Sequence, residues 1–168
     1  MNRGPEAVIL GALAGCVATL PMTATMSRLH QKLPSTERYP LPPRELAEDL
    51  PSLGAGTATA TLVYHFLYGA AAGALFGGVT RRRDIPTGAA YGIAVWVASY
   101  LGWIPATRRL KVAARHPARR NGMMLITHLV WGAALTAGLR ELERSRAASF
   151  SQSTSTEKRL KDRPETRL

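Results

Sequence analysis

The chain has 168 residues and a net charge of +11, and its single cysteine excludes a disulfide within the chain. This length fits one domain, and the charge alone would suggest a nucleic-acid-binding protein. We expect no nucleic-acid partner, because the basic residues lie in connectors and at the ends of apolar stretches, where Lys and Arg anchor membrane spans and contact anionic lipid headgroups.

Four long stretches without Asp, Glu, Lys or Arg predict four membrane-spanning helices. They cover residues 7–26, 58–79, 86–104 and 122–139. A helix needs ~20 residues to cross ~30 Å of hydrocarbon, and each stretch is close to that length. Pro5 suits the first turn of the first helix, whereas Pro21 is expected to kink or end that helix. The sequence therefore predicts an all-α integral membrane protein with a four-helix bundle over residues 1–146.

The connectors between the spans differ in character. Residues 27–53 contain five prolines, which keep most of this segment extended, and a short surface helix is expected over 43–50. Residues 81–84 form a tight basic turn. The next connector carries six basic residues that we expect to bind lipid headgroups, with capture of an anionic solute as the alternative: Arg108, Arg109, Lys111, Arg115, Arg119 and Arg120. Residues 147–168 are rich in Ser, Thr and charged residues, which predicts a disordered tail.

The second and fourth spans carry the same phrase, His-x-x-aromatic-Gly-Ala-Ala, at residues 65–71 and 128–134. The first and third spans also share a proline six residues before a glycine. We interpret the chain as two copies of a two-helix hairpin. Two spans per copy give both copies the same orientation, which predicts a pseudo-twofold axis along the membrane normal.

Residues three or four apart share a helix face, and such faces define the expected interior of the bundle. Small residues at this spacing let membrane helices approach closely, which predicts glycine-zipper packing. The packing glycines are Gly11, Gly15, Gly69, Gly73, Gly77, Gly88, Gly92 and Gly132. The same faces carry an expected polar pocket, made of His65, His128, Tyr68, Trp131, Thr19 and Ser99. Ionisable residues inside membranes are often functional, although each histidine can equally fix helix packing through a hydrogen bond.

The chemistry of this pocket leaves two interpretations open. Two histidines on facing helices can ligate haem iron, so a bis-histidine haem protein for electron transfer or sensing is the alternative to a protein without a cofactor. We expect no metal site, because no carboxylate or thiol stands near the histidines. The sequence also lacks a nucleophile–base pattern, a phosphate loop and an HExxH motif, so we expect no enzyme.

Two further predictions concern the ends of the chain. Leu13 to Cys16 matches a lipoprotein cleavage box, but the apolar run continues past Cys16, so we expect an uncleaved span. The basic residues are divided between the two sides of the spans and leave the orientation open. We expect both termini in the cytoplasm, which is the common arrangement for an even number of spans.

Three phrases resemble the YagU-like small inner-membrane proteins of bacteria. They are Leu20 to Thr23, Pro40 to Arg44, and His128 to Gly132 followed by Arg140 and Glu141. The resemblance covers most of residues 5–146 and implies a multi-span inner-membrane protein linked to acid tolerance, with no catalytic residue. Together with the pocket, it suggests a non-enzymatic accessory protein or small permease in envelope or acid homeostasis. Its expected partners are membrane lipids and either a second copy or another membrane protein.

Overall fold

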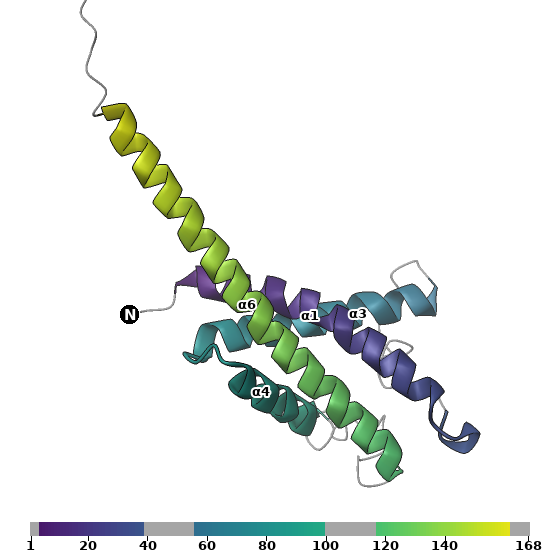
Figure 1. Cartoon of the computed structure of the whole chain (residues 1–168). Helices are drawn as coiled ribbons and strands as arrows, with labels where there is room; N and C mark the ends of the chain where they lie inside the picture. Colours follow the sequence, from purple (N-terminus) through teal and green to yellow (C-terminus); the bar gives the residue numbers. More distant parts are fainter. Residues whose placement is uncertain (1–3, 39–55, 100–116, 162–168) are drawn as a thin grey trace, which may run out of the picture.

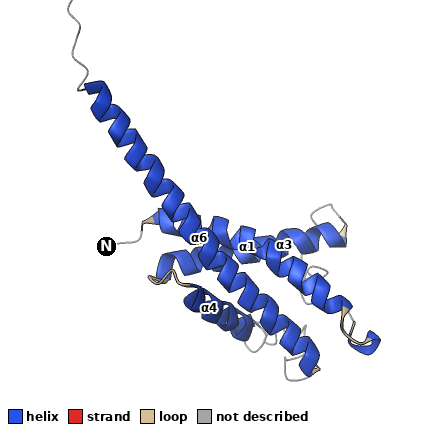
Figure 2. Ribbon diagram, in the orientation of Figure 1, coloured by secondary structure: helices blue, strands red, loops and turns tan. Residues whose placement is uncertain are grey.

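The computed structural model describes residues 4–38, 56–99 and 117–161, with side chains described up to residue 149. Within these ranges the regular elements are all helical, and no strand occurs (Figure 2). The elements are α1 (Pro5–Gln31), the 3-10 turn η1 (Ser35–Glu37), α3 (Thr57–Val79), α4 (Ile85–Val97) and α6 (Ala118–Lys161) (Figure 1). The prediction of an all-α protein is confirmed. α1, α3 and α6 are long and apolar enough to cross a membrane, and α4 is a shorter apolar helix.

The first two predicted spans correspond to α1 and α3. The observed α3 starts one residue before the predicted span of 58–79, but α1 continues to Gln31, five residues past its predicted end. Pro21 lies inside α1 and does not end it. A proline removes one N–H from the helical ladder, but beyond Pro21 the helix buries Met22 and Met26. Tertiary packing of this kind supplies most helical stability in proteins, so α1 continues.

The third span begins one residue before its predicted start and is described only in its first part. α4 starts at Ile85, and Asp84 caps it by accepting a hydrogen bond from the Thr87 N–H at 2.9 Å. Residues 98–99 continue in a wider helical turn. The rest of the predicted span of 86–104 lies outside the described residues, as does the short surface helix expected over 43–50.

The fourth span belongs to a much longer helix than expected. α6 contains the predicted span of 122–139 but runs from Ala118 to Lys161, and Figure 1 shows its second half projecting beyond the other helices. This corrects the prediction of disorder from residue 147, although residues 162–168 lie outside the description. The physical reason is continuity: no Gly or Pro stands between residues 139 and 161 to stop a helix already held by the bundle.

Packing among the helices is centred on α1 and α6, which run antiparallel. α1 packs against both α3 and α6, and α4 packs against α6. The main core lies between them and contains Ala14, Ala18, Met22, Phe76, Val95, Trp131, Leu135 and Leu139. Inside it the rings of Phe76, Tyr91 and Trp131 follow one another with centroid distances of 4.9 and 6.0 Å. This row of rings links α3, α4 and α6.

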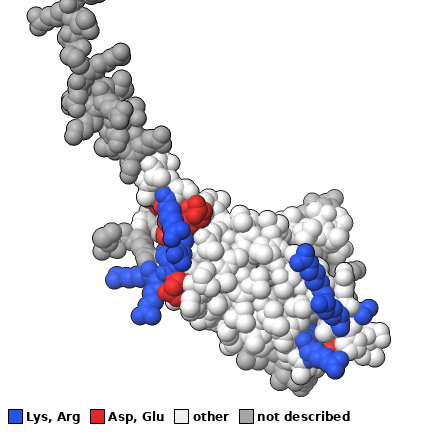
Figure 3. All heavy atoms as spheres, in the orientation of Figure 1, with Lys and Arg blue, Asp and Glu red and all other residues white. Residues whose placement is uncertain are grey.

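Charged residues gather at two ends of the surface seen in Figure 3, and a broad uncharged belt separates them. One end lies where α1 starts and α6 leaves the bundle, and there Glu6 and Arg146 form an ion pair. The other lies where α1 ends and α6 starts, near Lys32 and Arg119. Large apolar side chains on the belt are exposed, including Ile9, Leu13, Val17 and Leu20 along one side of α1. This surface is compatible with a membrane protein.

Candidate functional site

Glycines bring α1 and α3 into backbone contact. A Cβ on Gly15 would lie 2.8 Å from the Cα of Gly73, and a Cβ on Gly11 would lie 3.0 Å from the Cα of Gly77. Gly69 packs directly on the side chain of Thr19. Real Cβ atoms do not approach backbone this closely, so only glycine fits at these positions while the helices keep this separation. The five predicted packing glycines of these two helices therefore meet at one interface.

The remaining three predicted glycines meet between α4 and α6. A Cβ on Gly132 would lie 2.8 Å from the carbonyl carbon of Gly88 and 3.1 Å from the amide nitrogen of Gly92. Gly88 also packs on the side chain of Thr136, whose hydroxyl donates to the Gly132 carbonyl at 3.1 Å. α4 and α6 are thus held as closely as α1 and α3.

His128 lies in the interior of the bundle, on the part of α6 that faces α1 and α4. Its side chain is 8% exposed, and its Nδ1 lies 2.7 Å from the carbonyl oxygen of Met124, one turn earlier. The same carbonyl accepts from the Thr127 hydroxyl at 2.8 Å. A carbonyl oxygen is an acceptor, so Nδ1 of a neutral His128 carries the proton and Nε2 carries the lone pair.

The Gly15 carbonyl on α1 is a second meeting point of polar groups. It accepts a hydrogen bond from the Trp131 Nε1 at 3.2 Å and another from the Thr19 hydroxyl at 2.9 Å. Both side chains are almost completely buried. Trp131 stands one turn after His128 on α6, so these two hydrogen-bond centres lie next to each other.

The other predicted pocket residues are placed less centrally. Ser99 is buried and shares a 2.7 Å hydrogen bond with the Tyr68 hydroxyl, but the Tyr68 side chain is 41% exposed. Tyr68 therefore lies at the edge of the interior rather than within it, because its long ring lets only the hydroxyl reach Ser99. His65 is half-buried on α3.

The predicted lipid-binding residues are described only in part. Arg108, Arg109, Lys111 and Arg115 lie outside the described residues. Arg119 is exposed at the start of α6. Arg120 is 1% exposed and donates from Nη1 to the Glu37 carbonyl at 3.2 Å, which contradicts its predicted place at the lipid headgroups. The first turn of α6 directs Arg120 toward the segment after α1 and away from the surface.

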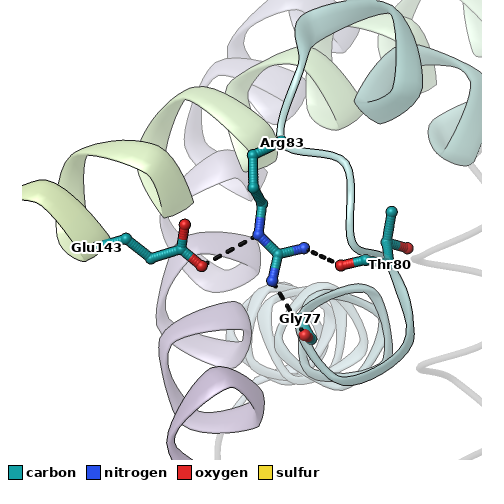
Figure 4. Close-up of polar contacts among 4 residues, drawn as sticks. All are labelled: Gly77, Thr80, Arg83 and Glu143. Atoms are coloured by element: carbon teal, nitrogen blue, oxygen red, sulfur yellow. Dashed lines mark hydrogen bonds and ion pairs between the residues drawn. The ribbon is translucent and has the colours of Figure 1, made fainter. Parts of the chain in front are cut away.

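Sequence reasoning missed the function of Arg83 at the opposite end of the bundle. Figure 4 shows its guanidinium reaching three acceptors. Nε donates to the Glu143 carboxylate at 3.1 Å, Nη2 to the Gly77 carbonyl at 3.1 Å, and Nη1 to the Thr80 carbonyl. The guanidinium also lies 5.5 Å from the centre of the Phe76 ring. A basic residue just past a helix end commonly binds the last carbonyls, and this rule identifies Arg83 from its position in the turn after α3.

Asp84 lies beside Arg83, directly before α4. Its hydrogen bonds with Thr87 hold the pKa of the Asp84 carboxyl below its usual value, because they stabilise the charged form. The carboxylate is exposed and serves as the cap of α4. We assign it a structural function.

Within the described ranges, no three or more His, Cys, Asp or Glu side chains lie close enough together to bind a metal ion. No family model, curated protein or solved structure matches the chain. The interpretation of the site therefore depends on its own residues and their contacts.

Proposed function

We propose that this chain is a non-enzymatic integral protein of a bacterial inner membrane, acting as a small permease or accessory protein in envelope or acid homeostasis. The observation that carries this proposal is the burial of His128 inside a bundle whose surface has a broad uncharged belt. Placing an ionisable side chain at membrane depth costs free energy. Such side chains usually face the bundle interior or a water-filled cavity, and they often mark functional sites. The bacterial inner membrane follows from the YagU-like resemblance alone.

The glycine contacts support a bundle made of two repeated hairpins. In the first copy the glycines of α1 meet those of α3, and in the second copy the glycines of α4 meet Gly132 of α6. Each copy thus pairs its first helix with the helix that carries the His-x-x-aromatic-Gly phrase. The ion pair between Glu6 and Arg146 puts the start of α1 and the exit of α6 at one end, where we propose that both termini face the cytoplasm.

The polar centre of the proposed path is formed by His128, Trp131 and Thr19, with His65 at its edge. The hydroxyl of Thr19 and the indole of Trp131 share the Gly15 carbonyl, and His128 is held by the Met124 carbonyl. The interior is thus polar without an acidic side chain among these residues. Such a path favours a proton carried by histidine, which needs no carboxylate partner.

The test is a flux assay with the full chain in liposomes that contain a pH-sensitive dye. We expect an imposed acid gradient to collapse faster than in protein-free liposomes. His128→Asn keeps a donor where Nδ1 stands but removes Nε2, so it is expected to slow the collapse. His30→Asn, near the end of α1, is the matched control and should match the unmodified chain. A gradient that persists as in protein-free liposomes removes the permease and leaves the accessory protein.

A further inference from the structure

Apart from the first residue, all methionines of the chain are buried on the two helices α1 and α6, one in the main core and three in a second cluster beside it. We call them the methionine cluster: Met22 and Met26 on α1, and Met123 and Met124 on α6. Their side chains are between 3% and 6% exposed. Met26, Met123 and Met124 pack together, and Trp96 of α4 packs against them. Met22 lies one turn before Met26 on the same face of α1.

The register between α1 and α6 places His128 beside this cluster. The two helices are antiparallel, and Trp131 bonds to Gly15 at 3.2 Å while Met26 packs on Met124. Between these two contacts, Met22 on α1 is level with the turn of α6 that carries His128. This register places thioethers from two helices and one imidazole at neighbouring levels of the bundle.

The hydrogen bond of His128 prepares its ring to bind a cation. Its Nδ1 donates to the Met124 carbonyl at 2.7 Å. Nε2 therefore carries the lone pair and is the ring atom that can bind a metal ion. Histidines that bind metals generally donate their second nitrogen to a carbonyl or carboxylate, which fixes the tautomer and orients the ring. The backbone of α6 supplies this second contact.

We infer that the methionine cluster and the Nε2 of His128 bind a soft monovalent cation, Cu(I), inside the bundle. Thioethers are soft ligands that select Cu(I), whereas Mg²⁺ and Ca²⁺ require oxygen ligands. These ligands are neutral, so the bound ion keeps a single positive charge, and a single charge is far less costly to desolvate than a double one. Binding changes no oxidation state and releases no proton from a thioether. This inference goes beyond the proposed function, because binding requires no transport.

The opposing interpretation is that the methionines only fill gaps in the core, which is a common use of this flexible side chain. The two interpretations differ in what a soft cation does to the sulfur atoms. If the methionines are packing residues, the cation leaves their methyl environments unchanged. If they are ligands, the cation binds at a fixed stoichiometry, and His128 contributes to the affinity.

The experiment uses Ag(I), a redox-inert probe of the same soft class, and the full chain in detergent with methyl-labelled methionine. Cys16→Ser removes the only thiol, and all further variants are made in that background. We expect Ag(I) to shift the methyl signals of the methionine cluster and to saturate at one ion per chain. Signals that stay in place, or shifts confined to Met1, overturn the inference.

Two variants test the ligands with little risk to folding. Met26→Leu combined with Met124→Leu nearly conserves volume, which cores usually tolerate. His128→Asn keeps the donor to the Met124 carbonyl. Each is expected to weaken Ag(I) affinity at least tenfold, whereas Ile126→Leu, on the exposed side of α6, should leave it unchanged. Equal affinity in all variants overturns the inference. Because binding is measured in detergent, its failure is separate from a failure of the flux assay.

Discussion

Replacement of Gly73 by alanine tests the close backbone contact between α1 and α3. A Cβ on Gly73 would lie 2.7 Å from the Cα and 3.0 Å from the amide nitrogen of Gly15, both backbone atoms that no rotamer change can move away. Ordinary contact begins at 3.4 Å, so α1 must withdraw from α3. A gap of roughly 0.5–1 Å loses a quarter to a half of the dispersion attraction between the facing atoms.

Gly78 in the same helix is the matched control. A Cβ there meets only a methyl of the Val8 side chain, at 3.3 Å. Both substitutions gain about 1 kcal/mol from the higher helix propensity of alanine, so this gain cancels in the comparison. The remaining difference comes from overpacking at Gly73. Adding a methyl group to a well-packed core typically lowers the free energy of unfolding by about 1–3 kcal/mol.

The assay is unfolding of the purified chain by SDS in a mild detergent, followed by circular dichroism. Gly73→Ala is expected to unfold at a lower SDS fraction than the unmodified chain, and Gly78→Ala at an equal or higher one. Equal midpoints for the two variants would refute the contact between α1 and α3. Gly11 and Gly15 would then be small residues without a packing function.

Three further predictions concern the polar contacts. Arg83→Met should lower the free energy of unfolding by about 1–3 kcal/mol, because it leaves carbonyls at the end of α3 unbonded; SDS unfolding measures this. Tyr68→Phe and Ser99→Ala should each lower the free energy of unfolding by about 1 kcal/mol. Because the two residues share one hydrogen bond, the double variant should lose little more than either single variant. The depressed pKa of Asp84 means that its stabilisation of α4 is complete above about pH 4 and is lost as pH falls through its lower folded value. Faster hydrogen exchange of the Thr87 amide at low pH checks this loss, and Asp84→Ala should show fast exchange already at neutral pH.

The sequence predicted the helices better than it predicted their ends. The absence of charge over 58–79 located α3 to within one residue, because charged side chains are excluded from such spans. The ends of α1 and α6 depended on tertiary contacts and on the absence of helix breakers. Pro21 is tolerated because the turns beyond it are buried, and α6 continues because no Gly or Pro stops it before Lys161.

Helical spacing predicted which residues face the interior of the bundle. It did not predict how deeply each side chain is buried. The three- and four-residue spacing correctly put Thr19, His128 and Trp131 on inward faces. It also put Tyr68 inside, and the basic character of the connector before α6 put Arg120 at the lipid headgroups. Helical spacing assigns a face but not the distance that a long side chain reaches, and the exposed ring of Tyr68 and the buried guanidinium of Arg120 are set by contacts from other segments.

The threonine hydrogen bonds of the interior stay within single helices. The buried hydroxyls of Thr19, Thr127 and Thr136 donate to carbonyls of their own helices, three or four residues earlier. Such bonds satisfy the hydroxyl but do not connect one helix to another. Between α1 and α6 the Trp131 bond to the Gly15 carbonyl does connect them. Where α1 meets α3 and where α4 meets α6, glycines let the bare backbones approach directly. For that reason the size of residue 73 should matter more to stability than the loss of a threonine hydroxyl.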